Sequence, residues 1–167
     1  MNIANALTVA RIILSPFIIL FLLLDFPNHE FYALGIFLIA AFTDIIDGPI
    51  ARKRGEDSRF GASWDPLADK LLIIPPLITI AFQMNLLWLW LGAILLVLRE
   101  MFMVAMRRKV SKNGLSVKAG WEGKYKMWLQ GLTVVALMIN SFIAPYVLWL
   151  AVFQTYFSAV RNVLRWR

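Results

Sequence analysis

The chain has 167 residues, of which 60% are hydrophobic and 16% charged, and its formal net charge is +7. This apolar share is well above that of soluble domains, so the sequence predicts an integral membrane protein. The positive charge points to anionic lipid headgroups or phosphorylated substrates and argues against nucleic-acid binding, because most of the chain would lie in lipid. There is no cysteine, so a metal ion would need oxygen or histidine ligands.

Six apolar stretches follow one another along the chain. They predict one all-α domain over residues 1–167, a bundle of six transmembrane helices. The breaks between them carry Gly, Pro, Asn or clusters of charge, which favour turns. The stretches cover about residues 4–24, 31–51, 66–82, 86–106, 122–141 and 144–164.

The seventeen Lys and Arg residues orient this bundle. They gather near both ends of the chain and around the breaks at 52–65 and 107–121, whereas the breaks at 25–30, 83–85 and 140–143 contain none. Cytoplasmic loops carry the excess of Lys and Arg in membrane proteins. We therefore expect both termini, and a basic face, on the cytoplasmic side.

Four charged residues lie equally far from the outer ends of their stretches. Each is thirteen residues inward, which is roughly 20 Å along a helix. We therefore expect them to share one plane near the cytoplasmic boundary of the membrane. They are Arg11, Asp44, Asp69 and Arg99.

Two pairs of aspartates occur at helical spacing near this plane. Asp44 and Asp47 are three residues apart, and Asp65 and Asp69 are four apart, so each pair shares one face of a helix. Four carboxylates in a poorly solvated place repel one another unless a cation compensates them. Hard divalent ions fit, which predicts a site for two Mg²⁺ or Mn²⁺ ions of the kind used in phosphoryl transfer. The alternative is that Asp44 and Asp47 pair with Arg11, Arg52 or Arg99 inside the bundle.

The same stretch carries a specific pattern. It reads Asp44-x-x-Asp47-Gly48-x-x-Ala51-Arg52, then eight residues, then Gly61-x-x-x-Asp65-x-x-x-Asp69. In these positions the chain resembles the signature of the CDP-alcohol phosphatidyltransferases. Members of that family are six-helix membrane enzymes that displace CMP from a CDP-linked lipid or alcohol with a second alcohol.

The resemblance implies a role for each matching residue. The four aspartates would bind the metal ions, and Asp69 would also be the general base on the acceptor hydroxyl. A homodimer in a bacterial cell membrane is implied, with the active site facing the cytoplasm. The residues implied in binding a CDP-lipid, here CDP-diacylglycerol, are Asn5, Thr8, Asp47, Gly48, Ala51, Arg52 and Gly61.

Three further segments resemble the branch of this family whose acceptor is sn-glycerol 3-phosphate and whose products are phosphatidylglycerol phosphate and CMP. They are "NALTVAR" at 5–11, "LREMFMVAMRR" at 98–108 and "GKYKMWLQ" at 123–130. A phosphorylated acceptor needs fixed cations. For Arg99 the alternative is a buried structural pair with Glu100. The candidates for binding the acceptor phosphate are Arg99, Arg107, Lys118, Lys124 and Lys126.

Other activities stay open at this point. Within the family, a phosphatidylinositol-phosphate synthase would also need basic contacts, and a cardiolipin synthase would accept phosphatidylglycerol. From another class, a divalent-cation transporter could use carboxylates inside the membrane. A transporter should carry polar residues through to the outer side, whereas the second and third apolar stretches contain few polar residues outward from the plane of charge.

Overall fold

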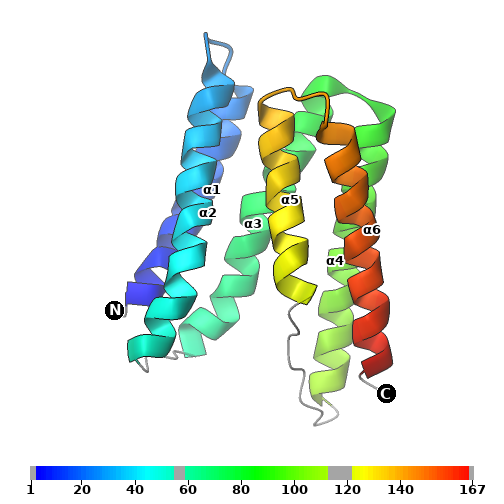
Figure 1. Cartoon of the computed structure of the whole chain (residues 1–167). Coiled ribbons are helices and arrows are strands. Elements are labelled where there is room, and N and C mark those ends of the chain that lie inside the picture. Colours follow the sequence, from blue (N-terminus) through cyan, green and yellow to red (C-terminus); the bar gives the residue numbers. More distant parts are fainter. Residues whose placement is uncertain (1–2, 55–58, 113–121, 166–167) are drawn as a thin grey trace. The chain divides into compact units, whose positions relative to one another are not determined.

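The computed structural model describes residues 3–54, 59–112 and 122–165, and this part of the chain consists of six α-helices (Figure 1). The helices lie where the apolar stretches predict them, so the all-helical fold is confirmed. Their bounds are α1 (Ile3–Leu23), α2 (His29–Arg54), α3 (Arg59–Met84), α4 (Leu87–Lys112), α5 (Glu122–Met138) and α6 (Ala144–Arg165).

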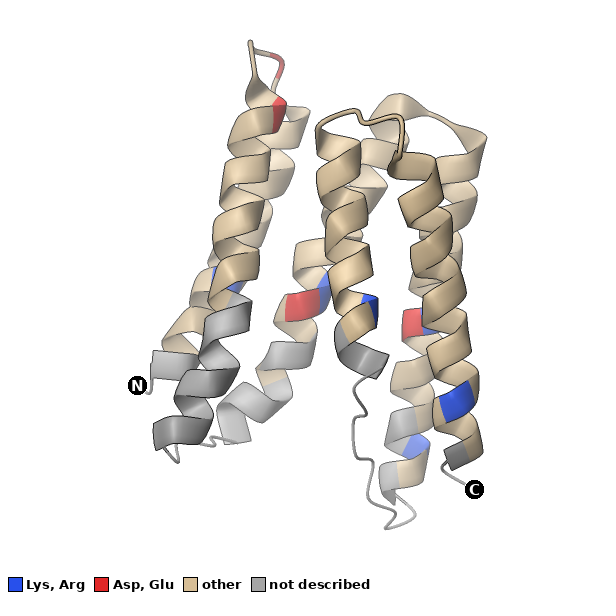
Figure 2. Ribbon diagram, in the orientation of Figure 1, with Lys and Arg blue, Asp and Glu red and all other residues tan. Residues whose placement is uncertain are grey.

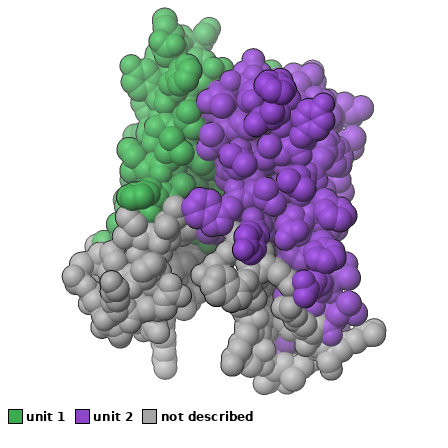
Figure 3. All heavy atoms as spheres, viewed as in Figure 1, with its two compact units in different colours: residues 1–83 green, residues 84–167 purple. Residues whose placement is uncertain are grey.

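The chain divides into two compact units, residues 1–83 and 84–167, which are described separately (Figure 3). In the first unit α1 packs along α2. The amide of Gln83 on α3 donates to the carbonyl oxygen of Leu22 on α1, so α1 also lies beside α3. In the second unit α6 is central, because both α4 and α5 pack against it.

Three asparagines form the tight turns after α1, α3 and α5. Asn28, Asn85 and Asn140 have φ angles of 64°, 47° and 48°. Asparagine tolerates this left-handed conformation because its short polar side chain can bond locally. His29 closes the first turn by donating from Nδ1 to the carbonyl oxygen of Phe21 at 3.0 Å. These turns fall at three of the predicted breaks.

Three helices extend beyond the apolar stretches that predict them. α2 continues through Pro49 to Arg54, α3 begins at Arg59, and α4 ends at Lys112. Among the described residues, four helices are long and apolar enough to cross a membrane. The apolar part of α2 is shorter, and α5 has 17 residues. The four candidate spans are Asn5–Leu23, Leu67–Met84, Leu87–Met106 and Ala144–Leu164.

The buried face of α1 changes from polar to apolar along the helix. Thr8, Arg11 and Ser15 are buried in its first part, and Ile18 and Leu22 are buried after them. This spacing of three and four residues places all five on one face. The Ser15 hydroxyl donates to the carbonyl oxygen of Arg11 at 2.8 Å, so its own polar group is satisfied inside the helix.

The buried face of α6 changes in the reverse order. Leu148 and Ala151 are buried in its first half, and Thr155, Ser158 and Asn162 in its second. In the first unit, the polar part of α1 therefore lies at the end of the helix away from the α1–α2 turn. In the second unit, the polar part of α6 lies at the end away from the α5–α6 turn. The described Lys and Arg residues lie in the same halves (Figure 2).

Candidate active site

A buried ion pair joins α1 to α3 in the first unit. Arg11 Nη1 donates to Asp69 Oδ1 at 2.8 Å. The Arg11 side chain is fully buried, whereas that of Asp69 is 32% exposed. A buried guanidinium requires a partner of opposite charge, and Asp69 supplies one. The predicted equal depth of these two residues is confirmed, and Asp69 keeps an accessible carboxylate beside the buried cation.

The other three predicted metal ligands lie on the helices expected of them. Asp44 and Asp47 are in α2, and Asp65 is in α3 one turn before Asp69. A continuous helix places residues three or four apart on one face, so each pair shares a face. Their side chains lie outside the described residues. Among the side chains that the structure describes, no three His, Asp or Glu form a metal-binding group.

The residues predicted to bind the CDP-lipid come from α1, α2 and α3. Asn5 and Thr8 lie on the Arg11 face of α1, at steps of three residues, and Thr8 is buried. Both make polar contacts in the structure. The remaining residues lie on helices that the structure describes, but their side chains are outside the described set: Gly48, Ala51 and Arg52 in α2 and Gly61 in α3.

A second charged cluster lies in the second unit. Glu100 Oε1 accepts hydrogen bonds from Arg99 Nη1 at 2.8 Å and from Lys126 Nζ at 2.5 Å. Arg99 also donates from Nε to the carbonyl oxygen of Thr155 at 2.9 Å. Arg99 and Glu100 are both buried. The alternative of a buried Arg99–Glu100 pair is therefore confirmed, and Lys126 joins this pair from α5.

Thr155 is a member of this cluster that the sequence did not single out. Its carbonyl oxygen receives Arg99, and its hydroxyl is reached by Gln130 Nε2 at 3.5 Å. A backbone acceptor carries no side-chain signal. The only sequence feature at this position is a threonine on the buried face of α6, which is common in membrane helices.

The other predicted phosphate-binding residues lie at the ends of α4 and α5. Arg107 is in α4 and Lys124 is in α5, with side chains outside the described residues. Lys118 lies outside the described residues altogether. Their assignment to the acceptor phosphate stays a prediction.

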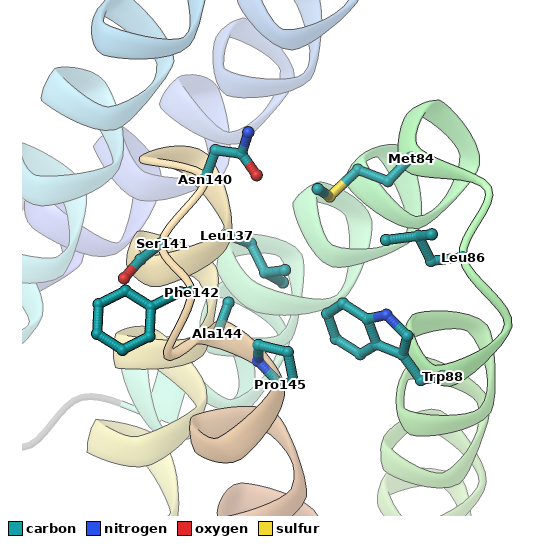
Figure 4. A pocket seen from close by; sticks show the side chains of 9 residues that line it. All are labelled: Met84, Leu86, Trp88, Leu137, Asn140, Ser141, Phe142, Ala144 and Pro145. Carbon is teal, nitrogen blue, oxygen red and sulfur yellow. The ribbon is translucent and has the colours of Figure 1, made fainter.

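The second unit also contains a pocket of about 250 Å³ at the end opposite this cluster (Figure 4). It opens between the start of the unit and the α5–α6 turn, where the Trp88 ring faces the side of Pro145. Asn140 and Ser141 supply its polar atoms, and no Lys or Arg lines it. The pocket therefore lacks the cations that a diphosphate or a phosphorylated alcohol requires.

Comparison with known proteins decides the family. The model of the family described as CDP-alcohol phosphatidyltransferase matches residues 1–157. The chain belongs to this family. It is therefore an enzyme, and the predicted resemblance is confirmed over most of its length.

Curated relatives cover the chain almost from end to end. The chain is 34% identical to a protein of Escherichia coli (strain K12), over 96% of this chain and 95% of that protein. It is 32% identical to one of Haemophilus influenzae, over 96% and 90%, and 29% identical to one of Wigglesworthia glossinidia brevipalpis, over 99% and 98%. Each of the three is named CDP-diacylglycerol--glycerol-3-phosphate 3-phosphatidyltransferase.

The carboxylate side chains on α2 and α3 are suitable ligands for a divalent cation. Asp69 offers a partly exposed carboxylate, and Asp65 precedes it by one helical turn. α2 carries the second aspartate pair and is joined to α3 through residues 55–58, so the two pairs occur on neighbouring helix ends. Carboxylate oxygens are the ligands that Mg²⁺ and Mn²⁺ prefer.

Proposed function

We propose that this enzyme transfers the phosphatidyl group of CDP-diacylglycerol to sn-glycerol 3-phosphate, giving phosphatidylglycerol phosphate and CMP. The choice of donor and acceptor is supported by the names of relatives that match this chain nearly end to end. The reaction chemistry is supported by one observation above all, the contact between Arg11 and a partly exposed Asp69.

In the proposed reaction the acceptor hydroxyl attacks the phosphorus of the phosphatidyl group. A new oxygen–phosphorus bond forms, the bond from that phosphorus to the CMP oxygen breaks, and CMP leaves opposite the attacking oxygen. The hydroxyl proton passes to the Asp69 carboxylate. Arg11 holds Asp69 through Oδ1 and thereby fixes the direction of that carboxylate.

Two divalent cations, Mg²⁺ or Mn²⁺, would bind Asp44, Asp47, Asp65 and Asp69 and would offset the charge of the diphosphate as CMP leaves. The backbone beside these ligands would receive the cytidine diphosphate. Gly48, Ala51 and Gly61 are small and permit close approach, and Arg52 supplies a cation there.

For the membrane arrangement we propose six spans with both termini and the active site on the cytoplasmic side of a bacterial cell membrane. The positive-inside distribution of Lys and Arg supports this orientation. The change from polar to apolar along the buried faces of α1 and α6 also supports it, because the chemistry then lies at one end of each helix. We further propose a homodimer surrounded by membrane lipids, on the family resemblance.

The buried residues argue against a divalent-cation transporter. Beyond Ser15 in α1 and before Thr155 in α6, the described buried residues are apolar, such as Ile18, Leu22 and Leu148. An ion path through the membrane would need polar groups there. Polar chemistry confined to one end of a helix suits an enzyme that works at the membrane surface.

The test is CMP release by the purified protein in detergent with Mg²⁺ and labelled CDP-diacylglycerol. We expect release on addition of glycerol 3-phosphate, and its loss in Asp69→Asn. The matched control is Asp25→Asn, since Asp25 lies in the α1–α2 turn and is exposed. Release only with inositol phosphate or phosphatidylglycerol would overturn the acceptor and keep the family.

A further inference from the structure

Glu100 connects two cations on different helices. One of its carboxylate oxygens, Oε1, accepts from Arg99 Nη1 on the same helix and from Lys126 Nζ on α5. The Glu100 side chain is 11% exposed, so the carboxylate is largely withdrawn from water. Each of these charge-assisted bonds is stronger than a hydrogen bond between neutral groups. Glu100 therefore determines where the Lys126 ammonium lies.

The carboxylate is itself held in place. Arg99 is 4% exposed and is fixed at a second point, because its Nε donates to the carbonyl oxygen of Thr155 on α6. A planar guanidinium with two bonds of defined direction has little freedom to turn. The order of support thus runs from the α6 backbone to Arg99, from Arg99 to Glu100, and from Glu100 to Lys126.

Lys126 is the most accessible member of the cluster. Its side chain is 17% exposed, and it lies near the start of α5, the end at which the described Lys and Arg of this unit gather (Figure 2). A lysine side chain normally loses considerable rotamer entropy when it binds a ligand. Holding the ammonium in advance reduces that loss.

We propose that Glu100 is a positioning residue, which holds the Lys126 ammonium at the place where it binds the phosphate of the acceptor. This inference rests on the proposed function, in which the acceptor is a phosphorylated alcohol. Glu100 does not touch the substrate, since its contribution passes through Lys126.

Glu100 could also weaken acceptor binding, and this opposite effect would change the KM for the acceptor in the other direction. A carboxylate beside an anion site repels the phosphate, so a Glu100 that merely competed for Lys126 would weaken acceptor binding. Its neutralisation would then lower the KM for the acceptor. A positioning role requires the reverse, because the freed lysine would have to be ordered by the substrate itself.

The experiment measures steady-state CMP release by the full chain in mixed micelles, with CDP-diacylglycerol and glycerol 3-phosphate varied in turn. For Glu100→Gln we expect the KM for glycerol 3-phosphate to rise about tenfold or more, the effect of one charge-assisted hydrogen bond. The KM for CDP-diacylglycerol should stay within about twofold, because that substrate does not use Lys126. Glu100→Asp keeps the charge and should recover part of the loss.

A double-mutant cycle shows whether Glu100 acts through Lys126. Lys126→Met should raise the same KM, and Glu100→Gln combined with Lys126→Met should be no worse than Lys126→Met alone. The matched control is Tyr156→Phe, which removes a hydroxyl that donates to the carbonyl oxygen of Leu95 at 3.1 Å, a contact between α6 and α4 outside the cluster. Its kinetics should match those of the original chain.

A lower acceptor KM in Glu100→Gln, or additive effects in the cycle, would overturn the proposal. Equal increases in both KM values would also overturn it, since they indicate a general structural role. Where Glu100→Gln fails to fold, Glu100→Asp takes its place in the cycle with the same criteria. If Lys126→Met keeps its acceptor KM, the inference fails and the proposed function stands. If glycerol 3-phosphate releases no CMP from the original chain, both fall.

Discussion

Arg11 on α1 and Asp69 on α3 form a 2.8 Å ion pair across 58 residues of sequence. The arginine is fully buried and the aspartate is one-third exposed. The pair therefore joins a residue that is withdrawn from water to one that solvent can reach. This contact explains why a buried position of α1 carries an arginine.

The first prediction concerns the stability that this pair provides. Arg11→Met leaves Asp69 without its buried partner, and we expect the free energy of unfolding to fall by about 2–3 kcal/mol, at the lower end for buried pairs because water can reach Asp69. Denaturant unfolding in detergent measures this change. Arg11→Met combined with Asp69→Asn should cost less than the sum of the two single changes. Strict additivity would show that the pair contributes nothing.

The sequence predicted the depth of this pair but not the pairing. Counting residues inward from the outer ends placed Arg11 and Asp69 in one plane, and their contact confirms it. Which carboxylate meets Arg11 depends on how each helix is rotated about its axis, and packing decides that rotation. The same holds for Lys126, whose partner Glu100 lies on another helix.

The sequence predicts the positions of the helices and turns closely. It does not predict where the charged ends of the helices stop, because hydrophobicity carries no signal there. Turns marked by Asn28, Asn85 and Asn140 fall at predicted breaks, because a local conformational need is visible in the residue type. The charged ends of α2 and α4 are helical beyond the apolar stretches. Lys and Arg are good helix formers, so a loss of hydrophobicity marks the edge of the membrane and not the end of a helix.

The second prediction concerns the metal ions. Treatment with EDTA should abolish CMP release, and Mg²⁺ should restore it, since the four aspartates need a cation to bind a diphosphate. Asp65→Asn should require at least about tenfold more Mg²⁺ for half-maximal rate, because it removes one charged ligand. Asp25→Asn is the control, with an unchanged Mg²⁺ requirement. Full activity in EDTA would exclude a metal-dependent mechanism.

The third prediction concerns the contact of α4 with α6. A Cβ atom at Gly92 would lie 2.5 Å from Leu148 Cδ2 and 2.8 Å from its Cγ, and Leu148 is fully buried. Gly92→Ala should therefore lower stability by about 1–3 kcal/mol, as overpacking does. Thermal unfolding in detergent is the measurement.

Gly35 on α2 provides the matched control, since a Cβ there meets no atom within 4 Å. Gly35→Ala should be neutral or should stabilise by about 0.5–1 kcal/mol through the lower backbone entropy of alanine. Combined with Leu148→Ala, the change Gly92→Ala should add no further cost, because the obstructing side chain is gone. Similar effects of the two glycine changes would contradict the close approach.

The fourth prediction tests the orientation in the membrane. The chain has no cysteine, so single cysteines can be introduced and labelled without a background. Asp25→Cys and Phe142→Cys replace exposed residues in the turns after α1 and α5, and Lys109→Cys replaces an exposed residue near the end of α4. In intact spheroplasts a membrane-impermeant maleimide should label the first two and should label Lys109→Cys only after permeabilisation, because positive charge is retained on the cytoplasmic side. Labelling of Lys109→Cys from outside would reverse the orientation and place the aspartates of α2 and α3 on the wrong side for a cytoplasmic acceptor.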